Sequence, residues 1–216
     1  MRGTPALLSI SRTPTLPGGI SVSGNNAADG RDSTYLRGIQ VTDSDGVVSF
    51  HSIFPGHCDS RATHTHILTH LNSSVNENNG TLVVGTGSVA HIGQLFWNEV
   101  LRSAVVGTFP YMTNTQAITS NADDMWSIEQ ASGAYDPFPD YIYLGHDLTG
   151  GLFAWKQIGV NTSADCTNNS YYSIAAYYEA DSGHQNEDSS AFGGSGGNGV
   201  PSRTPPSSAV PTSMAA

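Results

Sequence analysis

Apolar and polar positions alternate along much of this chain, a pattern that predicts short β-strands rather than long helices. We expect strands over residues 36–42, 47–50, 64–71, 89–97, 141–144, 152–160 and 171–180. Short helices are predicted over residues 98–106 and 121–131, the second capped by Asn121. This many strands with so little helix are typical of an antiparallel β-sandwich with long loops, so an all-β sandwich is the expected fold.

The composition changes towards both ends of the chain. Residues 1–33 are rich in Gly, Ser, Pro and Asn with little periodic pattern, so we expect a mostly irregular segment. Residues 181–216 contain almost no large apolar side chain and predict a disordered tail. The ordered domain is therefore expected over residues 34–180.

Net charge, glycosylation sequons and cysteines bear on the partners and the location of the protein. The chain has 8 Lys and Arg against 18 Asp and Glu, and its net charge of -10 argues against nucleic acid or an anionic membrane as partner. Sequons begin at Asn72, Asn79, Asn161 and Asn168, and in so polar a chain they favour an extracellular glycoprotein, although the first residues make a poor signal peptide. Whether Cys58 pairs with Cys166 stays open, because sequence does not give their separation.

The candidate chemistry begins with a histidine pair. His64 and His66 lie two residues apart in a predicted strand, so their imidazoles share one face. Such a pair suits two ligands of one metal ion, and imidazole with phenolate or thiolate favours iron, copper or zinc over magnesium or calcium. Taken alone, the pair is more typical of two strand histidines satisfied by hydrogen bonds than of a metal site.

Several segments in a fixed order carry a family resemblance. They are Tyr35-Leu36-Arg37-Gly38, Pro55-Gly56-His57-Cys58, Arg61-Ala62-Thr63-His64-Thr65-His66, His91-Ile92-Gly93-Gln94-Leu95-Phe96, Asn121-Ala122-Asp123-Asp124 and Gly151-Leu152-Phe153-Ala154-Trp155. Together they resemble the intradiol ring-cleavage dioxygenases, above all the extracellular fungal-type branch related to protocatechuate 3,4-dioxygenase β-chains. The resemblance extends from about Thr34 to Glu179, most of the expected domain.

The resemblance implies a non-haem Fe(III) enzyme that cleaves catechol-type aromatic diols with O2 to cis,cis-muconate-type products. The family holds iron with two tyrosinates and two histidines; Tyr35 matches the first tyrosine, and His64 and His66 match the histidines. Arg61 matches an active-site arginine that would stabilise developing negative charge. Tyr35 and Arg61 are therefore the catalytic candidates, with a small aromatic diol and O2 as partners.

Two features depart from the family. The family usually has a further strand before its first tyrosine, and residues 1–33 show no sign of it, so we expect truncated, replaced or mispredicted sequence there and an exposed sheet edge. The other departure is a single position. Cys58 stands where the second tyrosine ligand is expected, and its side chain is too short to reach the same metal without a loop shift. A thiolate that did reach would favour Fe(II) or zinc more than a tyrosinate does. Two alternatives follow: a non-catalytic relative that binds metal or aromatic ligands, and a zinc-binding or hydrolytic enzyme that uses Cys58, His64 and His66.

Overall fold

The computed structural model describes residues 6–12, 37–57, 61–78, 80–83, 85–124, 126–127, 130–131, 133, 135–168, 176–178 and 183–185. The strands are β1 (Ala6–Arg12), β2 (Arg37–Val41), β3 (His64–Leu71), β4 (Ser88–Phe96), β5 (Asp140–Tyr143), β6 (Leu152–Trp155), β7 (Ala176–Tyr178) and β8 (Gly183–Gln185). The helices are α1 (Glu99–Val106) and two 3-10 turns, η2 (Tyr111–Thr113) and η3 (Leu148–Gly150). None of the helices in these ranges is long and apolar enough to cross a membrane.

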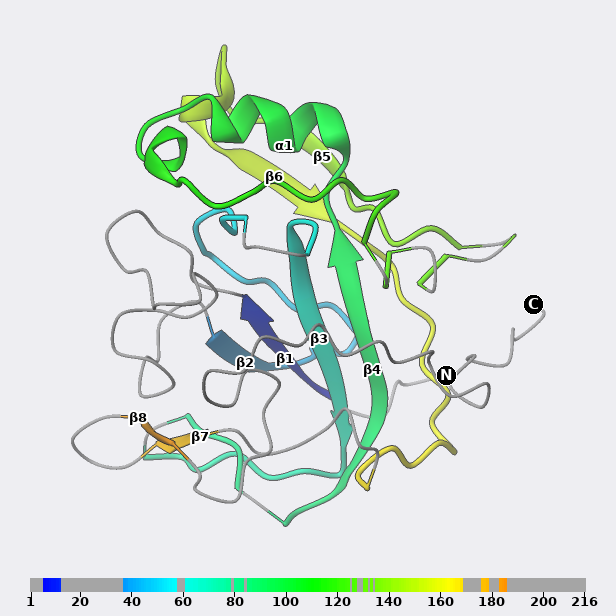
Figure 1. Ribbon diagram of the computed structural model, residues 1–216. Helices are drawn as coiled ribbons and strands as arrows, with labels where there is room; N and C mark the ends of the chain where they lie inside the picture. The colour runs from blue at the N-terminus through cyan, green and yellow to red at the C-terminus, as the bar shows by residue number, and fades with distance from the viewer. Residues whose placement is uncertain are drawn as a thin grey trace.

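The centre of the fold is a four-stranded antiparallel sheet in the order β2-β1-β3-β4 (Figure 1). β3 and β4 match their predicted strands to within one residue at each end. β5 with β6 and β7 with β8 form separate two-stranded sheets. The expected β class is confirmed, whereas the described strands do not establish the second stacked sheet that a sandwich requires.

The N-terminal segment departs from the expectation for residues 1–33. Ala6–Arg12 is not irregular but forms β1, which pairs with β2 on one side and with β3 on the other. Ser11 lies opposite both Arg37 and His66 in the backbone register. A strand therefore forms in the segment that was expected to lack one, and it lies inside the sheet, between β2 and β3. Gly183–Gln185 likewise forms a strand within the predicted tail, and the domain limits at residues 33 and 180 stay a prediction.

Of the strands predicted over residues 36–42 and 47–50, only the first forms in the described residues, as β2. β2 ends in a tight turn in which Oδ1 of Asp43 accepts the backbone N–H groups of Asp45 and Val47, each at 2.9 Å. Gly46 adopts a φ of 78°, a conformation that favours glycine. Residues 47–50 do not return as a strand, because β2 finds its backbone partner in β1 instead.

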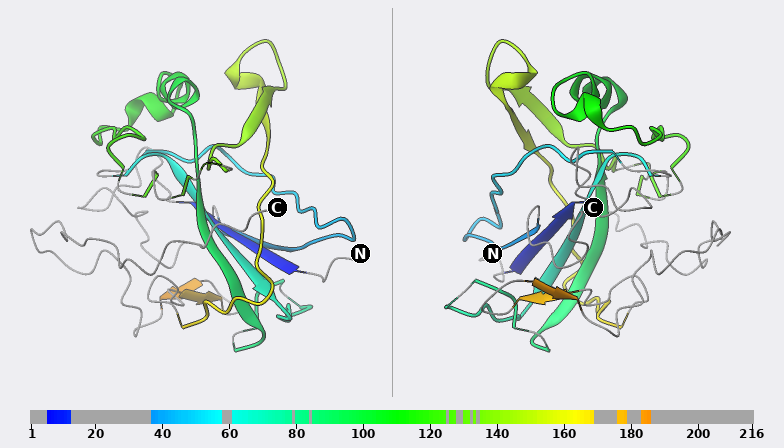
Figure 2. Two further views of the ribbon diagram at one scale, coloured as in Figure 1. Left: turned by 90° about the vertical axis from the view of Figure 1, so that its right-hand side faces the viewer. Right: turned by 60° about the vertical axis from the view of Figure 1, so that its left-hand side comes forward.

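Helix α1 begins where it was predicted. Oδ1 of Asn98 caps it by accepting the backbone N–H of Leu101 at 2.8 Å. Its inner face buries Leu101 and Val105 against Trp97, and the cluster is extended by Tyr141, Leu152 and Ala154 from β5 and β6. Because these contacts join α1 to the β5–β6 ribbon, the two form a lobe beyond the Phe96 end of β4 (Figures 1 and 2).

The helix predicted over residues 121–131 does not form in the residues that the structure describes there. Residues 121–124 and 126–127 make turns instead. Asn121 caps no helix; its Nδ2 donates to the carbonyl oxygen of Trp97 at 2.9 Å. Asp124 accepts the backbone N–H groups of Trp126 and Ser127, which competes with helical hydrogen bonding. The strand predicted over residues 152–160 is also shorter and ends at Trp155.

Candidate metal centre

The first residues of strand β3 bring two imidazoles together. His64 and His66 share a face of the strand, and their Nε2 atoms lie 3.1 Å apart. The two rings are nearly perpendicular, at 78°, and His64 also lies beside Phe96, its partner on β4. This is the end of the sheet that adjoins the α1 lobe (Figure 1). The predicted pair therefore converges on one point at the edge of the lobe.

Hydrogen bonding fixes which nitrogen of His64 carries the proton. Its Nδ1 lies 2.6 Å from the carbonyl oxygen of Ala62, and because a carbonyl only accepts, Nδ1 must be the donor. The Nε2 of a neutral His64 then keeps its lone pair, directed at His66. In the absence of a metal, the Nε2–H of His66 can donate to that lone pair. A metal ion between the rings would take the place of this proton.

Both imidazoles are held in the neutral form. Burial above all, then the repulsion from His66 whenever that ring is protonated, and the charge of Arg61 lower the pKa of His64 to about 3. Burial and then Arg61 lower the pKa of His66 to about 4. Neutral imidazole is the form that coordinates metals, so the pair needs no deprotonation at neutral pH.

The separation of the two nitrogens fits a shared metal ion. Two nitrogens at about 2.1 Å from one ion are about 3.0–3.4 Å apart for angles of about 90–110°, and the observed 3.1 Å lies in that range. No third His, Cys, Asp or Glu joins them among the residues that the structure describes. Tyr35 and Cys58, the other predicted ligands, lie outside the described residues.

Arg61 is anchored beside the pair by two polar side chains. Its Nε donates to Oδ2 of Asp124 at 2.8 Å, and its Nη2 donates to Oε1 of Gln94 at 2.5 Å. Gln94 lies opposite His66 in the β3–β4 register, so both side chains are on one face of the sheet. The guanidinium is thereby held at the histidine face, with its side chain 20% exposed.

Asp124 is the buried anchor of this arrangement. It is 3% exposed and accepts four further interactions besides the Arg61 Nε contact: from Arg61 Nη2 and from the backbone N–H groups of Ala62, Trp126 and Ser127. Burial raises the pKa of Asp124, but the hydrogen bond and charge of Arg61, with the backbone donors, outweigh it and lower the pKa overall. A carboxylate so completely satisfied is stable as an anion in the interior.

The charge of Arg61 affects the two histidines more than the charge of Asp124 does. Arg61 lowers the pKa of both His64 and His66, whereas Asp124 raises only that of His64 and is the smallest of its causes. The guanidinium therefore acts on the site more strongly than its counter-ion does. Such a site favours an anionic ligand next to the imidazoles.

Sequence reasoning assigned no role to Asp124 or Gln94, although both lie in segments that carry the family resemblance. For Asp124, the available signal was its residue type, because an aspartate often accepts the backbone N–H groups two and three residues later and so caps a turn. Gln94 could be found only through the pairing of β3 with β4, because it lies 33 residues from Arg61.

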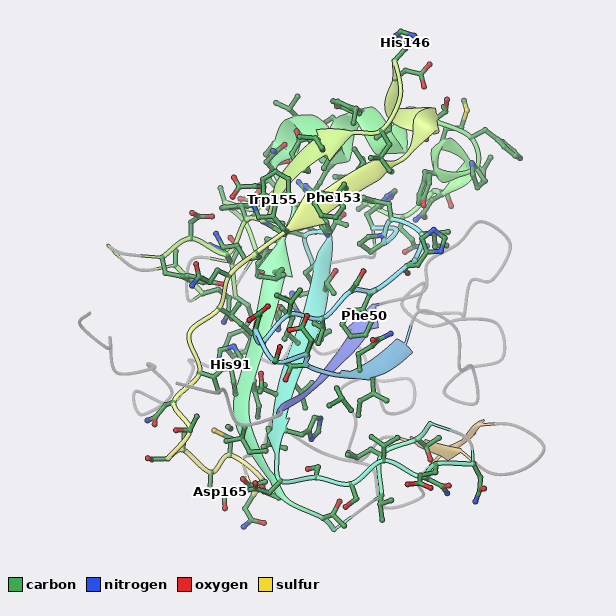
Figure 3. The ribbon with its side chains drawn as sticks, turned by 180° about the vertical axis from the view of Figure 1, so that it is seen from behind. Phe50, His91, His146, Phe153, Trp155 and Asp165 are labelled. Atoms are coloured by element: carbon green, nitrogen blue, oxygen red, sulfur yellow. The ribbon has the colours of Figure 1, made fainter. Side chains whose placement is uncertain are left out.

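The remaining histidines near the motif serve other contacts. His57 is buried, and its Nε2 lies 3.0 Å from the carbonyl oxygen of Gln116, to which it donates. His70 lies on β3 directly after a register shift that follows Thr69. His91, which is labelled in Figure 3, lies on β4 opposite Thr69. Cys166 forms no disulfide with a described residue, and its pairing with Cys58 stays open because Cys58 lies outside the described residues. The structure therefore brings together Arg61, His64 and His66, and leaves His57 and His70 outside their cluster.

Comparison with solved structures gives the fold a family context. An intradiol ring-cleavage dioxygenase from Tetranychus urticae matches with a TM-score of 0.54 and 22% identity, over 76% of this chain and 75% of that one. The dioxygenase Tetur07g02040 matches with a TM-score of 0.52 and 22% identity, over 76% and 74% of the two chains. Comparisons with protein-family models and with curated protein sequences gave no match. The chain has the fold of the intradiol ring-cleavage dioxygenases.

Proposed function

We propose that the chain is an intradiol ring-cleavage dioxygenase that opens catechol-type aromatic diols with O2 and gives cis,cis-muconate-type products. The observation that carries the proposal is the convergence of the two neutral Nε2 atoms beside Arg61. The fold of intradiol dioxygenases adds to it, because the pair lies in a chain of that architecture. In this proposal, His64, His66 and Tyr35 hold a non-haem Fe(III).

The protein side chains contribute binding and electrostatics. A bound Fe(III) would supply Lewis acidity that activates the diol toward O2. His64 and His66 are already neutral, so they can hold the ion without losing a proton from the coordinating nitrogen of His64. Arg61, fixed by Asp124 and Gln94, would stabilise the negative oxygens of the deprotonated diol.

Cys58 defines what this enzyme would lack. At the position of the second tyrosine, a cysteine offers a shorter side chain and a softer donor. The family tyrosine there leaves the metal and accepts a proton from the diol, and a cysteine that does not reach the metal cannot take that part. We therefore expect turnover to be slower than in a relative with both tyrosines, with Tyr35 as the remaining phenolate.

A second candidate function is a non-catalytic relative that binds metal or aromatic ligands. The observation that favours it is again Cys58, because the loss of one anionic phenolate weakens the preference for Fe(III). A zinc-dependent hydrolase that uses Cys58 with the two histidines ranks third. No Asp or Glu completes the histidine cluster among the described residues to serve as a general base.

The proposal is tested by oxygen uptake. Full-length protein loaded with Fe(III) is supplied with catechol or hydroxyquinol, and O2 consumption is recorded together with formation of the muconate-type diacid. The proposal predicts one O2 consumed for each product formed, and loss of both signals in Arg61→Met. Iron-loaded protein that consumes no O2 with either diol would instead support the non-catalytic relative.

Two further expectations accompany the proposal. We propose that β1–β4 form one layer of the β-sandwich expected for this family. We also propose that the protein is extracellular and glycosylated, with Asn72 and Asn161 as accessible sequon residues because both are exposed. Mass analysis of protein expressed through a eukaryotic secretory pathway, before and after glycosidase treatment, tests the second point.

A further inference from the structure

We propose that a cavity beneath helix α1 binds a small organic carboxylate. The cavity has a volume of about 160 Å³ and is lined by His57, Thr63, Arg102, Ser103, Val106 and Ile118. Neither the His64–His66 pair nor Arg61 belongs to its lining. At about 30 Å³ per water molecule, it has room for about five waters or one small organic acid. The cavity is therefore lined by other described residues than those of the candidate metal centre, although Thr63 directly precedes His64 in the chain.

Arg102 supplies the buried positive charge. This residue is 3% exposed, its Nη1 donates to the carbonyl oxygen of Thr119 at 2.8 Å, and its Nη2 contacts Glu99. Its Nε has no acceptor among the residues that the structure describes. A buried donor without a partner is unfavourable, so an acceptor that reaches Nε from the cavity lined by Arg102 would be favoured.

Arg102 is paired with Glu99 through Nη2, but its buried Nε is left without an acceptor among the described residues. The side chain of Glu99 is 51% exposed, whereas that of Arg102 is 3% exposed. Solvent therefore screens the carboxylate more strongly than the guanidinium. The backbone N–H of Asn121 also donates to Glu99 at 2.6 Å and stabilises its carboxylate. A second carboxylate, carried by the ligand, can be accommodated next to Arg102.

The remaining walls select the body of the ligand. Val106 and Ile118 offer apolar side chains, and Thr63 adds a buried polar residue. His57 already donates its Nε2 proton to Gln116, so it does not compete for the ligand through that atom. Ser103 and Ile118 are exposed and mark the rim of the cavity. These walls fit a monocarboxylate with a short apolar body better than a bare phosphate or sulfate.

Calorimetric titration of the full-length protein with isobutyrate tests the proposal. We expect isobutyrate to bind equally to iron-loaded and metal-free protein, and the neutral isobutyramide to bind at least tenfold more weakly. Ile118→Trp, which fills the rim, should abolish binding, while Ile142→Trp, at a comparably exposed position on β5, should leave it unchanged. Arg102→Lys keeps the charge but removes Nε, and should weaken binding at least tenfold.

Several results overturn the proposal. Wild-type protein that binds no isobutyrate, or binds the amide as tightly, excludes a carboxylate site. Binding that survives Ile118→Trp, depends on iron, or is lost equally in Ile142→Trp excludes this cavity. Near-UV circular dichroism verifies folding of each variant. Should Ile118→Trp fail to fold, Ser103→Trp on the opposite rim takes its place with the same expected loss.

Discussion

Arg61 and Asp124 form an ion pair in which Nε and Oδ2 lie 2.8 Å apart and only the carboxylate is fully buried. The same oxygen accepts the backbone N–H of Ala62 at 2.7 Å. One carboxylate therefore joins the entry of β3, which carries the histidine pair, to a turn more than sixty residues later in the chain. The ion pair positions the arginine and the start of the strand together.

Removing the charge of Asp124 should destabilise the protein. Asp124→Asn leaves the Arg61 guanidinium, 20% exposed, without its anion, and we expect the free energy of unfolding to fall by about 3 kcal/mol. Urea unfolding at pH 7 measures the change. The matched control is Asp136→Asn. Asp136 also forms an ion pair, with Lys156, but its side chain is 64% exposed. That variant should lose less than about 1 kcal/mol, and equal losses in the two variants would contradict the anchoring role of Asp124.

Acid should destabilise the metal-free protein because its histidines resist protonation. The folded pKa values of about 3 for His64 and about 4 for His66 lie below the ordinary value of 6.5. Between these values the unfolded chain binds protons that the folded chain does not, so the free energy of unfolding falls as the pH falls below 6.5. Each group contributes up to about 1.4 kcal/mol per pH unit.

The contribution of one histidine can be separated from the others. His66→Gln removes one of the protons taken up on unfolding. From pH 6 to pH 4.5, the slope of its unfolding free energy against pH should therefore be smaller than that of wild type, and the difference should be about 1.4 kcal/mol per pH unit. Urea titrations in the presence of a chelator at several pH values measure this slope. An unchanged slope in the variant would show that His66 is protonated in the folded protein at those pH values.

The lobe that adjoins the site should depend on the inner face of α1. Leu101 is fully buried, and Leu101→Ala should reduce the free energy of unfolding by about 3 kcal/mol, through lost burial and the cavity that remains. Val100, the preceding residue on the same helix, is 78% exposed, so Val100→Ala should change it by less than about 0.5 kcal/mol. Similar losses in the two variants, measured by thermal or urea unfolding, would contradict the packing of α1 on the β5–β6 ribbon.

Local patterns predicted the elements that local interactions decide. β3, β4 and α1 were found within a residue or two because alternation, helical spacing and the Asn98 cap are visible in sequence. β1 was missed because Ala6–Arg12 is defined by pairing with strands that lie far from it in the chain. The helix expected after Asn121 was wrong because the Asp124 carboxylate takes the backbone N–H groups of that segment.

In the site, too, local sequence predicts some features and distant contacts decide the others. The shared face of His64 and His66 follows from their spacing alone, and their separation of 3.1 Å agrees with it. The neutral state of the pair depends on burial, and the position of Arg61 depends on Gln94 and Asp124, which come from other segments. Tyr35 and Cys58 lie outside the described residues, so their roles stay predictions.

Restoring a tyrosine at position 58 should reveal whether that position limits the chemistry. Cys58→Tyr returns a second phenolate, which stabilises Fe(III) and accepts a proton from the diol. We expect at least a tenfold rise in O2 consumption with catechol and a stronger visible absorption of the iron-loaded protein. Cys58→Ser, which has neither thiol nor phenol, is the control and should show no gain. Lower activity in Cys58→Tyr than in wild type would assign the cysteine a positive role.

The central claim is that His64 and His66 hold one metal ion together, and iron content after loading and gel filtration tests it most directly. Wild-type protein should retain about one Fe(III) per chain, and His66→Ala should lose at least tenfold in affinity because half of the pair is gone. His70→Ala, which removes another buried histidine of β3, should retain iron as wild type does. Iron retained fully by His66→Ala, or lost equally from His70→Ala, would contradict the assignment of the metal to this pair.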